Sequence, residues 1–350
     1  MKAKLRLAVV GTGMMATMRT KAFLETGQVE IAGIASRNAS KAVAFAASLE
    51  CSFSTDDFTE LADCRPDMVL VEVPHHVQTE VVKWALEQQY HVLVGSSMAV
   101  NMQEMNYIRQ LSAAHNLVVE GGFEARYKTV WKEARTMIHS GKIGNVCAIQ
   151  AIACWKADTE SWYYSQKESG GMPVTHMTYA FLNPLTWIFG MPRSISAIAN
   201  TTGVQRPGMV EEVTCAANIA YKDHIPCQLL ASYVHHPQTP NWKLFIQGTS
   251  GALEIFPGEF GNGKLVFYPA GDTSPIVMGF ENAPDPFVLQ AETFIRAVKG
   301  LGNELQNTPA HNAEDVQIAA TIVKSARTGK TIHLNTDLKK TAAIGPVVKE

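Results

Sequence analysis

A glycine-rich turn near the start of the chain has the spacing of a dinucleotide-binding turn. It reads Gly11-Thr12-Gly13-Met14-Met15-Ala16 and follows the apolar run Leu5 to Val10. In this G-x-G-x-x-A pattern, the first glycine allows a tight bend, the second lets a pyrophosphate approach the backbone, and the small third residue lets helix and strand pack closely. The unpaired N–H groups of the next helix would face the phosphates. A second apolar run, 29–35, completes a βαβ unit, which favours this interpretation over an ordinary turn.

The residues after that second run indicate which cofactor binds. An NAD site usually places Asp or Glu there to bond the ribose 2′-hydroxyl. This chain has no carboxylate there and reads Ser36-Arg37-Asn38-Ala39-Ser40-Lys41. Arg37 and Lys41 can hold a 2′-phosphate, so we expect NADP (NADPH), with NAD less favoured. The alternative is a solvated loop in which Asn38 caps the next helix, which is compatible with phosphate binding.

Composition indicates a cytoplasmic enzyme of two domains. The 350 residues are 46% hydrophobic and 18% charged, with a formal net charge of −2. Lys and Arg are scattered, so we expect no nucleic-acid partner. No uninterrupted apolar run approaches membrane-spanning length, so we expect no membrane partner. The six cysteines show no C-x-x-C spacing, which predicts reduced, mostly structural thiols.

Strand and helix patterns alternate to about residue 122 and predict a doubly wound parallel sheet. The run Met68 to Val73 is apolar apart from Glu72, as in a strand covered on both faces. The further elements expected here are helices over 14–26, 79–89 and 102–115 and strands over 91–94 and 117–120.

After Gly144 the pattern changes to long β-type runs. We expect strands over 146–155, 213–221, 225–234 and 242–247, a helix over 175–189, and late helices over 286–299 and 313–328. The predicted fold class is α/β: an N-terminal Rossmann sheet plus a C-terminal α+β domain with a large, mostly antiparallel sheet. The predicted domains are 1–122 for NADP and 123–350 for substrate and oligomerisation, with the C-terminal helices able to pack back on the first domain.

Blocks along nearly the whole chain resemble one family, that of glucose-fructose oxidoreductase, inositol dehydrogenase and rhizopine catabolism proteins (Gfo/Idh/MocA). These blocks are GTGMMA, ASRNASKA, VEVPHHVQTE, YHVLVGSSMAV, SGKIGNV, SGGMPVTHMTYAFLNPLTWIFG and SARTGKTIHL. The resemblance implies an oxidoreductase with a nicotinamide cofactor. It also implies a homodimer or homotetramer formed through the C-terminal sheet.

Two departures from the family pattern concern catalysis. Typical members carry Glu-Lys-Pro after the fifth strand, with the lysine near the nicotinamide as general acid and base; here the aligned residues are Gly95-Ser96-Ser97. The family pattern Asp-x-x-x-His-x-x-Asp aligns with His176, Ala180 and Asn183. The resemblance therefore describes a divergent member that lacks the usual lysine and histidine.

Catalysis can be rebuilt from other groups. His176, Tyr179 and Asn183 share one helical face, and His176 titrates near neutrality, so His176, Tyr179 and Ser96 are the catalytic candidates. The alternative is that His176 bonds a backbone carbonyl and Tyr179 lies in the core. A bare serine such as Ser96 is a poor acid, although an activated acceptor needs no strong one.

Further residues are expected to line the cofactor and the substrate. The cofactor-lining candidates are Val73, Pro74, His75, Gln78, Gly95, Ser96 and Arg126. His75, His76 and Gln78 are expected in a loop, and the His-His pair has no third ligand at metal spacing, so no metal is predicted. Glu124 and Arg126 are equally compatible with a surface ion pair. The substrate candidates are Lys156, Trp162, Tyr163 and Asn183, because aromatic faces with polar tips suit a sugar or another ring; core packing would use the same residue types.

The predicted function is NADP-dependent hydride transfer between nicotinamide and a carbonyl, alcohol or imine-like carbon of a sugar or other ring-bearing small molecule. Two alternatives remain at this point. One is a non-catalytic NADP-binding sensor or partner protein of the same fold. The other is an enzyme that uses tightly bound nicotinamide in a redox-neutral reaction.

Overall fold

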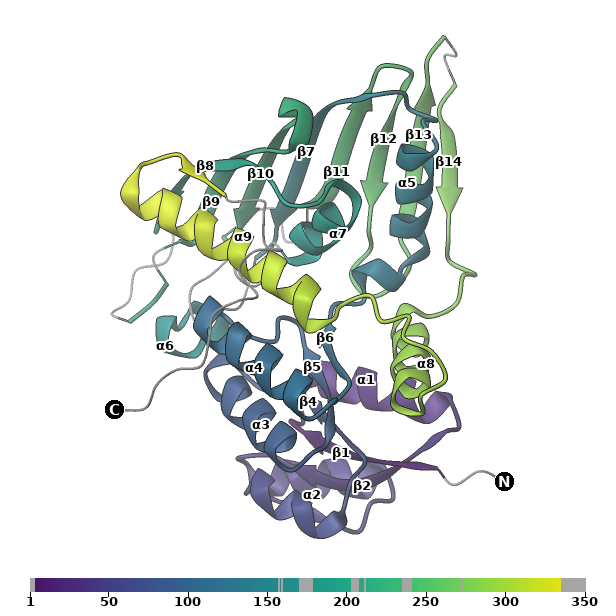
Figure 1. Cartoon of the computed structure of the whole chain (residues 1–350), viewed down its shortest axis with the longest axis vertical. Coiled ribbons are helices and arrows are strands. Elements are labelled where there is room, and N and C mark those ends of the chain that lie inside the picture. Colours follow the sequence, from purple (N-terminus) through teal and green to yellow (C-terminus); the bar gives the residue numbers. More distant parts are fainter. Residues whose placement is uncertain are drawn as a thin grey trace.

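The computed structural model arranges the chain in two β-sheets, one above the other in the view of Figure 1, with helices packed against them. It describes residues 4–156, 158, 160–169, 179–202, 208–210, 212–234, 241–271 and 274–334, without the side chains of 179 and 180. Within these ranges, no helix has the length and apolar character needed to cross a membrane.

The first sheet has six strands among the described residues, all parallel, in the order β3-β2-β1-β4-β5-β6. Its strands are β1 (Leu5–Val10), β2 (Val29–Ala35), β3 (Ser54–Thr55), β4 (Met68–Val71), β5 (His91–Gly95) and β6 (Val119–Gly122). Every residue of β4 is buried, as expected for a parallel strand with helices on both faces. The strand order reverses between β1 and β4, and ligands of such folds bind in the crevice at the carboxyl ends of these strands.

The connections of this sheet are α1 (Met14–Glu25), α2 (Ala39–Ser48), the 3-10 helix η1 (Phe58–Cys64), α3 (His75–Glu87) and α4 (Met102–Ala114). Asn38 and Asn101 cap α2 and α4, because their side chains accept the free N–H groups of Lys41 and Glu104. These caps explain why both helices begin where they do.

Two predicted helix starts are wrong by four residues. The last described helix begins at Pro309 and not at Ala313. The third helix begins at His75 and not at Thr79, since Pro74 has extended backbone (φ −55°, ψ 147°) and stands at the N-cap. His75, His76 and Gln78 therefore lie in the first turn of α3 and not in a loop.

The second sheet has nine described strands in the order β14-β13-β12-β11-β7-β10-β9-β8-β15. Its strands are β7 (Val146–Cys154), β8 (Ser194–Asn200), β9 (Thr214–Ala220), β10 (Pro226–Ser232), β11 (Asn241–Gly248), β12 (Gly251–Phe256), β13 (Lys264–Pro269), β14 (Ile276–Gly279) and β15 (Ile332–His333). Only the β7–β10 pair among them is parallel, so the predicted mostly antiparallel sheet is confirmed, and with it the fold class.

Helices cover one face of this sheet in Figure 1: α5 (Thr129–His139), α7 (Tyr179–Phe189) and α9 (Pro309–Thr328). Burial alternates along β10, where Cys227 and Leu229 are buried and Leu230 is exposed. This alternation is typical of an antiparallel sheet with one face on the core. The short helices η2 (Ala125–Tyr127), η3 (Trp162–Tyr164), α6 (Gln166–Ser169) and η4 (Lys222–His224) lie in the connections.

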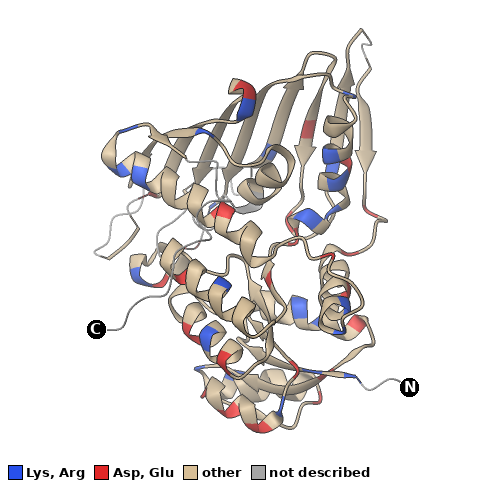
Figure 2. Ribbon diagram, in the orientation of Figure 1, with Lys and Arg blue, Asp and Glu red and all other residues tan. Residues whose placement is uncertain are grey.

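The last two helices of the described chain return toward the first sheet. α8 (Pro286–Val298) packs on α1, where the rings of Phe294 and Phe23 meet edge to face at 6.1 Å. α9 runs from α4 past α7 to β8. Groups from α1, α8 and the segment after β6 thus come together between the two sheets. Figure 2 shows Lys and Arg interspersed with Asp and Glu over the described elements.

Candidate functional site

The glycine turn stands between β1 and α1, where the strand order reverses. Gly11 has φ +118°, and a Cβ built on it would lie 2.0 Å from the carbonyl oxygen of Glu72, so only glycine fits. Gly13 is exposed, and a Cβ there would meet nothing within 4 Å beyond its chain neighbours. Ala16 is fully buried in α1. The turn therefore fits a pyrophosphate above Gly13, with Met14 and Met15 opening the helix beside it.

The end of β2 presents the residues expected at an adenosine ribose. The hydroxyls of Thr12 and Ser36 are 3.3 Å apart, which joins the glycine turn to the β2 end. The backbone N–H of Asn38 donates to Ser36 Oγ at 3.4 Å. Arg37 and Lys41 are exposed beside them at the start of α2. The structure thus brings together the predicted hydroxyls and cations at one edge of the crevice.

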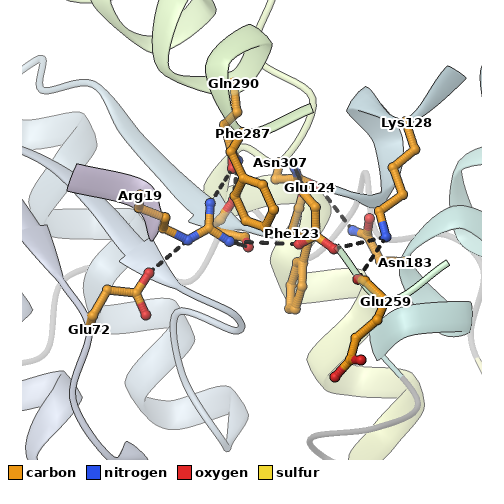
Figure 3. A network of polar contacts seen from close by, with 12 residues as sticks. Arg19, Glu72, Phe123, Glu124, Lys128, Asn183, Glu259, Phe287, Gln290 and Asn307 are labelled. Atoms are coloured by element: carbon orange, nitrogen blue, oxygen red, sulfur yellow. Dashed lines mark hydrogen bonds and ion pairs between the residues drawn. The ribbon is translucent and has the colours of Figure 1, made fainter. Parts of the chain in front are cut away.

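A buried ion pair lies at the other side of the glycine turn. Arg19 of α1 is 3% exposed, and its Nε is 2.7 Å from Oε1 of Glu72, the residue directly after β4 (Figure 3). The Glu72 carboxylate fills the space beside Gly95, where a Cβ would lie 2.1 Å from Oε2. Burial raises the pKa of Glu72 to about 7, against the lowering effect of Arg19.

Arg19 connects several elements at this point. Its guanidinium donates to Gln290 Oε1 at 2.6 Å and to the carbonyl of Gly122, and it lies 4.9 Å from the ring centre of Phe287. Glu124 lies 3.7 Å from Arg19 and 3.3 Å from Lys128 (Figure 3). The network joins α1, α8 and the segment after β6 around one buried cation.

Ser96 follows β5 in a constrained backbone position. Its φ of +51° is in the left-handed region, and its carbonyl accepts the N–H of Gly122 at 3.1 Å. The Ser96 hydroxyl is 3.3 Å from Nε2 of His75, whose Nδ1 is 3.0 Å from the carbonyl of Ser169. His75 is 5% exposed, whereas His76 is exposed. Two predicted site residues, the catalytic candidate Ser96 and the cofactor-lining candidate His75, are therefore in contact.

The other predicted residues on this wall are mostly structural in their contacts. Gln78 is buried, and its amide donates to the carbonyl of Ser97, so it fixes the loop after β5. Val73 and Pro74 are half-buried at the end of β4. In the described part of the chain, no three His, Cys, Asp or Glu side chains are grouped as metal ligands.

An aromatic cluster borders His75. The Trp162 ring meets His75 edge-on at 5.1 Å and Tyr163 at 4.4 Å. Tyr163 stacks on Tyr233 at 6.1 Å, and its pKa is raised by burial and by the nearby Glu72. Lys156 is exposed and pairs with Val234 by a backbone bridge. Trp162 thus contacts His75, and Tyr163 lies close enough to Glu72 for that carboxyl to affect its pKa.

Arg126 and Asn183 are turned into the interior. Arg126 is 1% exposed and donates to the backbone carbonyls of Asn183 and Gln306. The Asn183 amide donates to Asn307 Oδ1 at 3.0 Å and Asp315 Oδ2 at 2.7 Å. These contacts use polar groups that were expected to face ligands. Arg126 does not pair with Glu124, which lies beside Arg19 and Lys128 instead. The cofactor role of Arg126 stays a prediction. Buried polar groups need such partners. Asp315 comes from α9, and Gln306 and Asn307 come from the segment directly before it.

Two catalytic candidates cannot be placed. His176 lies outside the described residues, and Tyr179 begins α7 with only its backbone described. Conversely, Arg19 and Glu72 were missed as site residues. The sequence did contain a signal for them, namely a charged residue among apolar ones. Glu72 interrupts an otherwise apolar run, and Arg19 follows the glycine turn in α1.

Comparison with known families matches both parts of the chain. The description "Oxidoreductase family, NAD-binding Rossmann fold" (GFO_IDH_MocA) matches residues 5–123, and "GFO/IDH/MocA C-terminal domain" matches residues 131–254. Together these matches span most of the chain, including the glycine turn, Ser96 and the start of the second sheet.

Individual relatives are distant in sequence but similar in fold. The scyllo-inositol 2-dehydrogenase (NADP(+)) IolU of Bacillus subtilis is 23% identical over 310 residues, which is 84% of this chain and 88% of that protein. A levoglucosan dehydrogenase in complex with NADH and levoglucosan has a TM-score of 0.85 at 18% identity, covering 94% of this chain and 99% of that chain. The aldose-aldose oxidoreductase of Caulobacter crescentus, complexed with glycerol, has a TM-score of 0.84 at 18% identity, covering 95% and 100%. The chain therefore belongs to the GFO/IDH/MocA oxidoreductase family, whose N-terminal part is an NAD-binding Rossmann fold.

Proposed function

We propose that the protein is an NADP-dependent oxidoreductase that moves a hydride between nicotinamide C4 and a carbonyl or alcohol carbon of a sugar-like small molecule. The observation that carries the NADP part is the β2 end, where Thr12 and Ser36 hydroxyls stand beside the exposed Arg37 and Lys41. A planar guanidinium and an ammonium suit a phosphate dianion, and no carboxylate is present to bond a free 2′-hydroxyl.

The residues of the crevice fit the rest of such a cofactor. The open backbone at Gly13 and the start of α1 would hold the pyrophosphate, and Val73, Pro74 and Gly95 would border the nicotinamide. When bound, the nicotinamide supplies the hydride donor or acceptor. The chain's own task is to orient the substrate and move a proton.

The substrate class follows from the aromatic wall. The Trp162 and Tyr163 rings lie beside His75, which contacts Ser96. Aromatic rings can pack on the C–H faces of sugars while nearby hydroxyls bond polar groups. Two similar proteins, the scyllo-inositol 2-dehydrogenase and the levoglucosan dehydrogenase, support a polyol or anhydrosugar.

Fluorescence titration tests the cofactor assignment. We expect NADPH to bind more tightly than NADH, and Arg37→Ala to weaken NADPH binding by about ten-fold or more through loss of a charged hydrogen bond. NADH binding should change little. Arg109→Ala, an exposed arginine on α4, is the matched control. Tighter binding of NADH than NADPH by the wild-type protein would overturn the NADP assignment.

A redox screen tests the reaction. Levoglucosan and scyllo-inositol with NADP⁺, and their ketones with NADPH, should change the absorbance at the nicotinamide band. Bound NADPH that no sugar, ketone or imine can oxidise would favour a non-catalytic sensor. Turnover without any net absorbance change would favour a redox-neutral use of the cofactor.

The proposal extends to domains and assembly. We propose residues 1–122 as the cofactor domain and 123–350 as the substrate and oligomerisation part.

The assembly proposal rests on one face of the second sheet. The sheet face away from α5, α7 and α9 carries Ile198 of β8, Leu230 of β10 and Phe245 of β11, all exposed and separated from one another by β9 and β7. A homodimer or homotetramer through this face would bury them. Light scattering should give an oligomer, and Leu230→Glu with Phe245→Glu should give a monomer.

A further inference from the structure

The side chain that replaces the family's lysine has a partner. Ser96 aligns with the lysine of Glu-Lys-Pro, and serine alone is a weak acid and a weak base. Its backbone is held on one side by the Gly122 N–H, which donates to its carbonyl at 3.1 Å. A Cβ on Gly122 would come within 3.0 Å of the Ser96 nitrogen, so the two segments fit closely. The Ser96 backbone is therefore held at the sheet edge.

His75 is oriented so that it can accept the proton of that hydroxyl. Its Nδ1 is 3.0 Å from the Ser169 carbonyl, which can only accept, so Nδ1 carries the ring proton. Nε2 is then the basic nitrogen, and it lies 3.3 Å from Ser96 Oγ. The edge-on Trp162 ring, at 5.1 Å, limits how far the imidazole can turn. The Ser96 hydroxyl, the His75 base and the Ser169 carbonyl that orients the base thus form a chain of contacts like that around an activated serine.

We propose that Ser96 and His75 form the proton relay of this enzyme, in place of the lysine. The relay rests on the proposed hydride-transfer function. In alcohol oxidation, the substrate hydroxyl passes its proton to Ser96 Oγ as Ser96 passes its own proton to His75 Nε2. The substrate carbon loses hydride to the oxidised nicotinamide, the C–O bond becomes C=O, and His75 ends as imidazolium. Reduction of a ketone runs the same transfers backwards.

The surroundings of His75 keep the ring ready to accept. Burial lowers the pKa of His75 below its ordinary value of 6.5, and the neighbouring His76 lowers it further. Glu104 of α4 and the hydrogen bond to Ser169 of α6 oppose this effect. The other charged residues of these described elements are Lys167 and Glu168 on α6, Arg109 on α4, and Glu80, Lys83 and Glu87 on α3 itself. The neutral imidazole is thus the resting form at pH 7, and alcohol oxidation should slow as the pH falls through the pKa of His75.

The first test needs no substrate. Nitrogen-15 NMR of histidine-labelled protein with NADPH at pH 7.5 should show His75 protonated at Nδ1 and unprotonated at Nε2. Ser96→Ala should shift the Nε2 resonance, while the exposed His76 should keep the tautomer mixture of a free histidine. An Nε2-protonated His75, or an Nε2 signal indifferent to Ser96→Ala, would overturn the relay.

The second test is kinetic, with levoglucosan and scyllo-inositol as probes and NADP⁺ as oxidant. Single-turnover hydride transfer should fall about 100-fold or more in both His75→Gln and Ser96→Ala, with NADPH affinity retained. The rate of hydride transfer in the double variant should be no lower than in the single variants, because the two groups act as a unit. His75→Gln should also lose the acid limb of the pH profile, and imidazole should restore part of the rate to His75→Ala. His76→Ala is the matched control and should keep the wild-type rate at pH 7.5, although its acid limb should move to slightly higher pH because His76 lowers the pKa of His75.

The outcomes separate the relay from the function on which it rests. The relay would be wrong if His75→Gln transferred hydride at the wild-type rate, or if the rate losses of the two single variants multiplied in the double variant. The proposed oxidoreductase function would be unaffected by either result. A wild-type protein that binds NADPH but oxidises neither probe would count against the proposed substrate class. The relay would then be decided by the tautomer of His75 alone.

Discussion

The two ends of the proposed cofactor crevice are built in opposite ways. At the adenosine end, Arg37 and Lys41 are exposed and make no ion pair with a described residue. At the nicotinamide end, Arg19 is 3% exposed and is bonded to groups from α8 and from the end of β6. Arg37 and Lys41 are accessible to a ligand, whereas Arg19 is part of the protein interior.

The difference shows which charges select a ligand and which hold the fold. An exposed cation loses little when the ligand is absent, because water solvates it. A buried cation must keep its partners, because an unpaired charge in the interior is costly. Arg19 and Glu72 therefore hold the fold at this end, and the proposed ligand chemistry there belongs to Ser96 and His75, whose side chains are in contact.

The largest effect should follow from breaking the buried pair. Arg19→Met leaves the Glu72 carboxyl without its cation and removes the bonds to Gln290 and Gly122, so we expect a loss of about 3–5 kcal/mol in the free energy of unfolding. Urea unfolding measures it. Arg37→Ala, at the exposed end, should change that free energy by less than about 0.5 kcal/mol. Equal losses in the two variants would remove the contrast.

The pH dependence of stability sharpens the same contrast. The pKa of Glu72 is raised from 4.5 to about 7, so its carboxyl stabilises the fold fully below pH 4.5 and this contribution is lost as the pH rises through about 7. A shift of this size corresponds to about 3 kcal/mol. Glu72→Gln should flatten the decline of unfolding free energy between pH 5 and 8. Glu120, also buried with a pKa raised to about 7, should supply a second, separable decline that Glu120→Gln removes. If Glu72→Gln kept the wild-type dependence of the unfolding free energy on pH, ionisation of Glu72 would not destabilise the fold, and this prediction would be wrong.

The glycines of the turn should separate stability from binding. Gly11→Ala forces a Cβ to 2.0 Å from the Glu72 carbonyl oxygen at φ +118°, so we expect a loss of about 1–3 kcal/mol in stability. Gly13→Ala has open space at its Cβ and should cost less than about 1 kcal/mol. NADPH affinity should nevertheless fall in Gly13→Ala, because the methyl group occupies the pyrophosphate position. Unchanged affinity there would argue against a phosphate over Gly13.

The smallest effect concerns Lys41. A lysine acts on a phosphate as a point charge without the bidentate geometry of arginine, so Lys41→Ala should weaken NADPH binding less than Arg37→Ala does. Raising the salt concentration should reduce both differences, since the two cations are exposed. A salt-independent loss would mean that the residues act on the fold and not on the phosphate.

The chain itself specified the parts that depend on local pattern. The alternation to residue 122 and the long β-type runs after Gly144 predicted both sheets, because hydrophobic periodicity and turn residues are local signals. The glycine turn and the absence of a carboxylate at Ser36-Arg37-Asn38 were equally visible. Strands β8 and β12 to β15 were not predicted, since pairing with distant neighbours defines them more than their own residues do.

Only the tertiary structure decided which polar groups meet. Arg19 lies 53 positions from Glu72 and 271 positions from Gln290 in the chain. No local sequence pattern predicts contacts between residues so far apart. The tertiary structure also turned Arg126 and Asn183 inward, where Gln306, Asn307 and Asp315 bond them. The start of α3 directly after Pro74 brings His75 against Ser96. Burial and contact depend on the packing of segments distant in the chain, and these decide whether a polar side chain binds a ligand or stabilises the core.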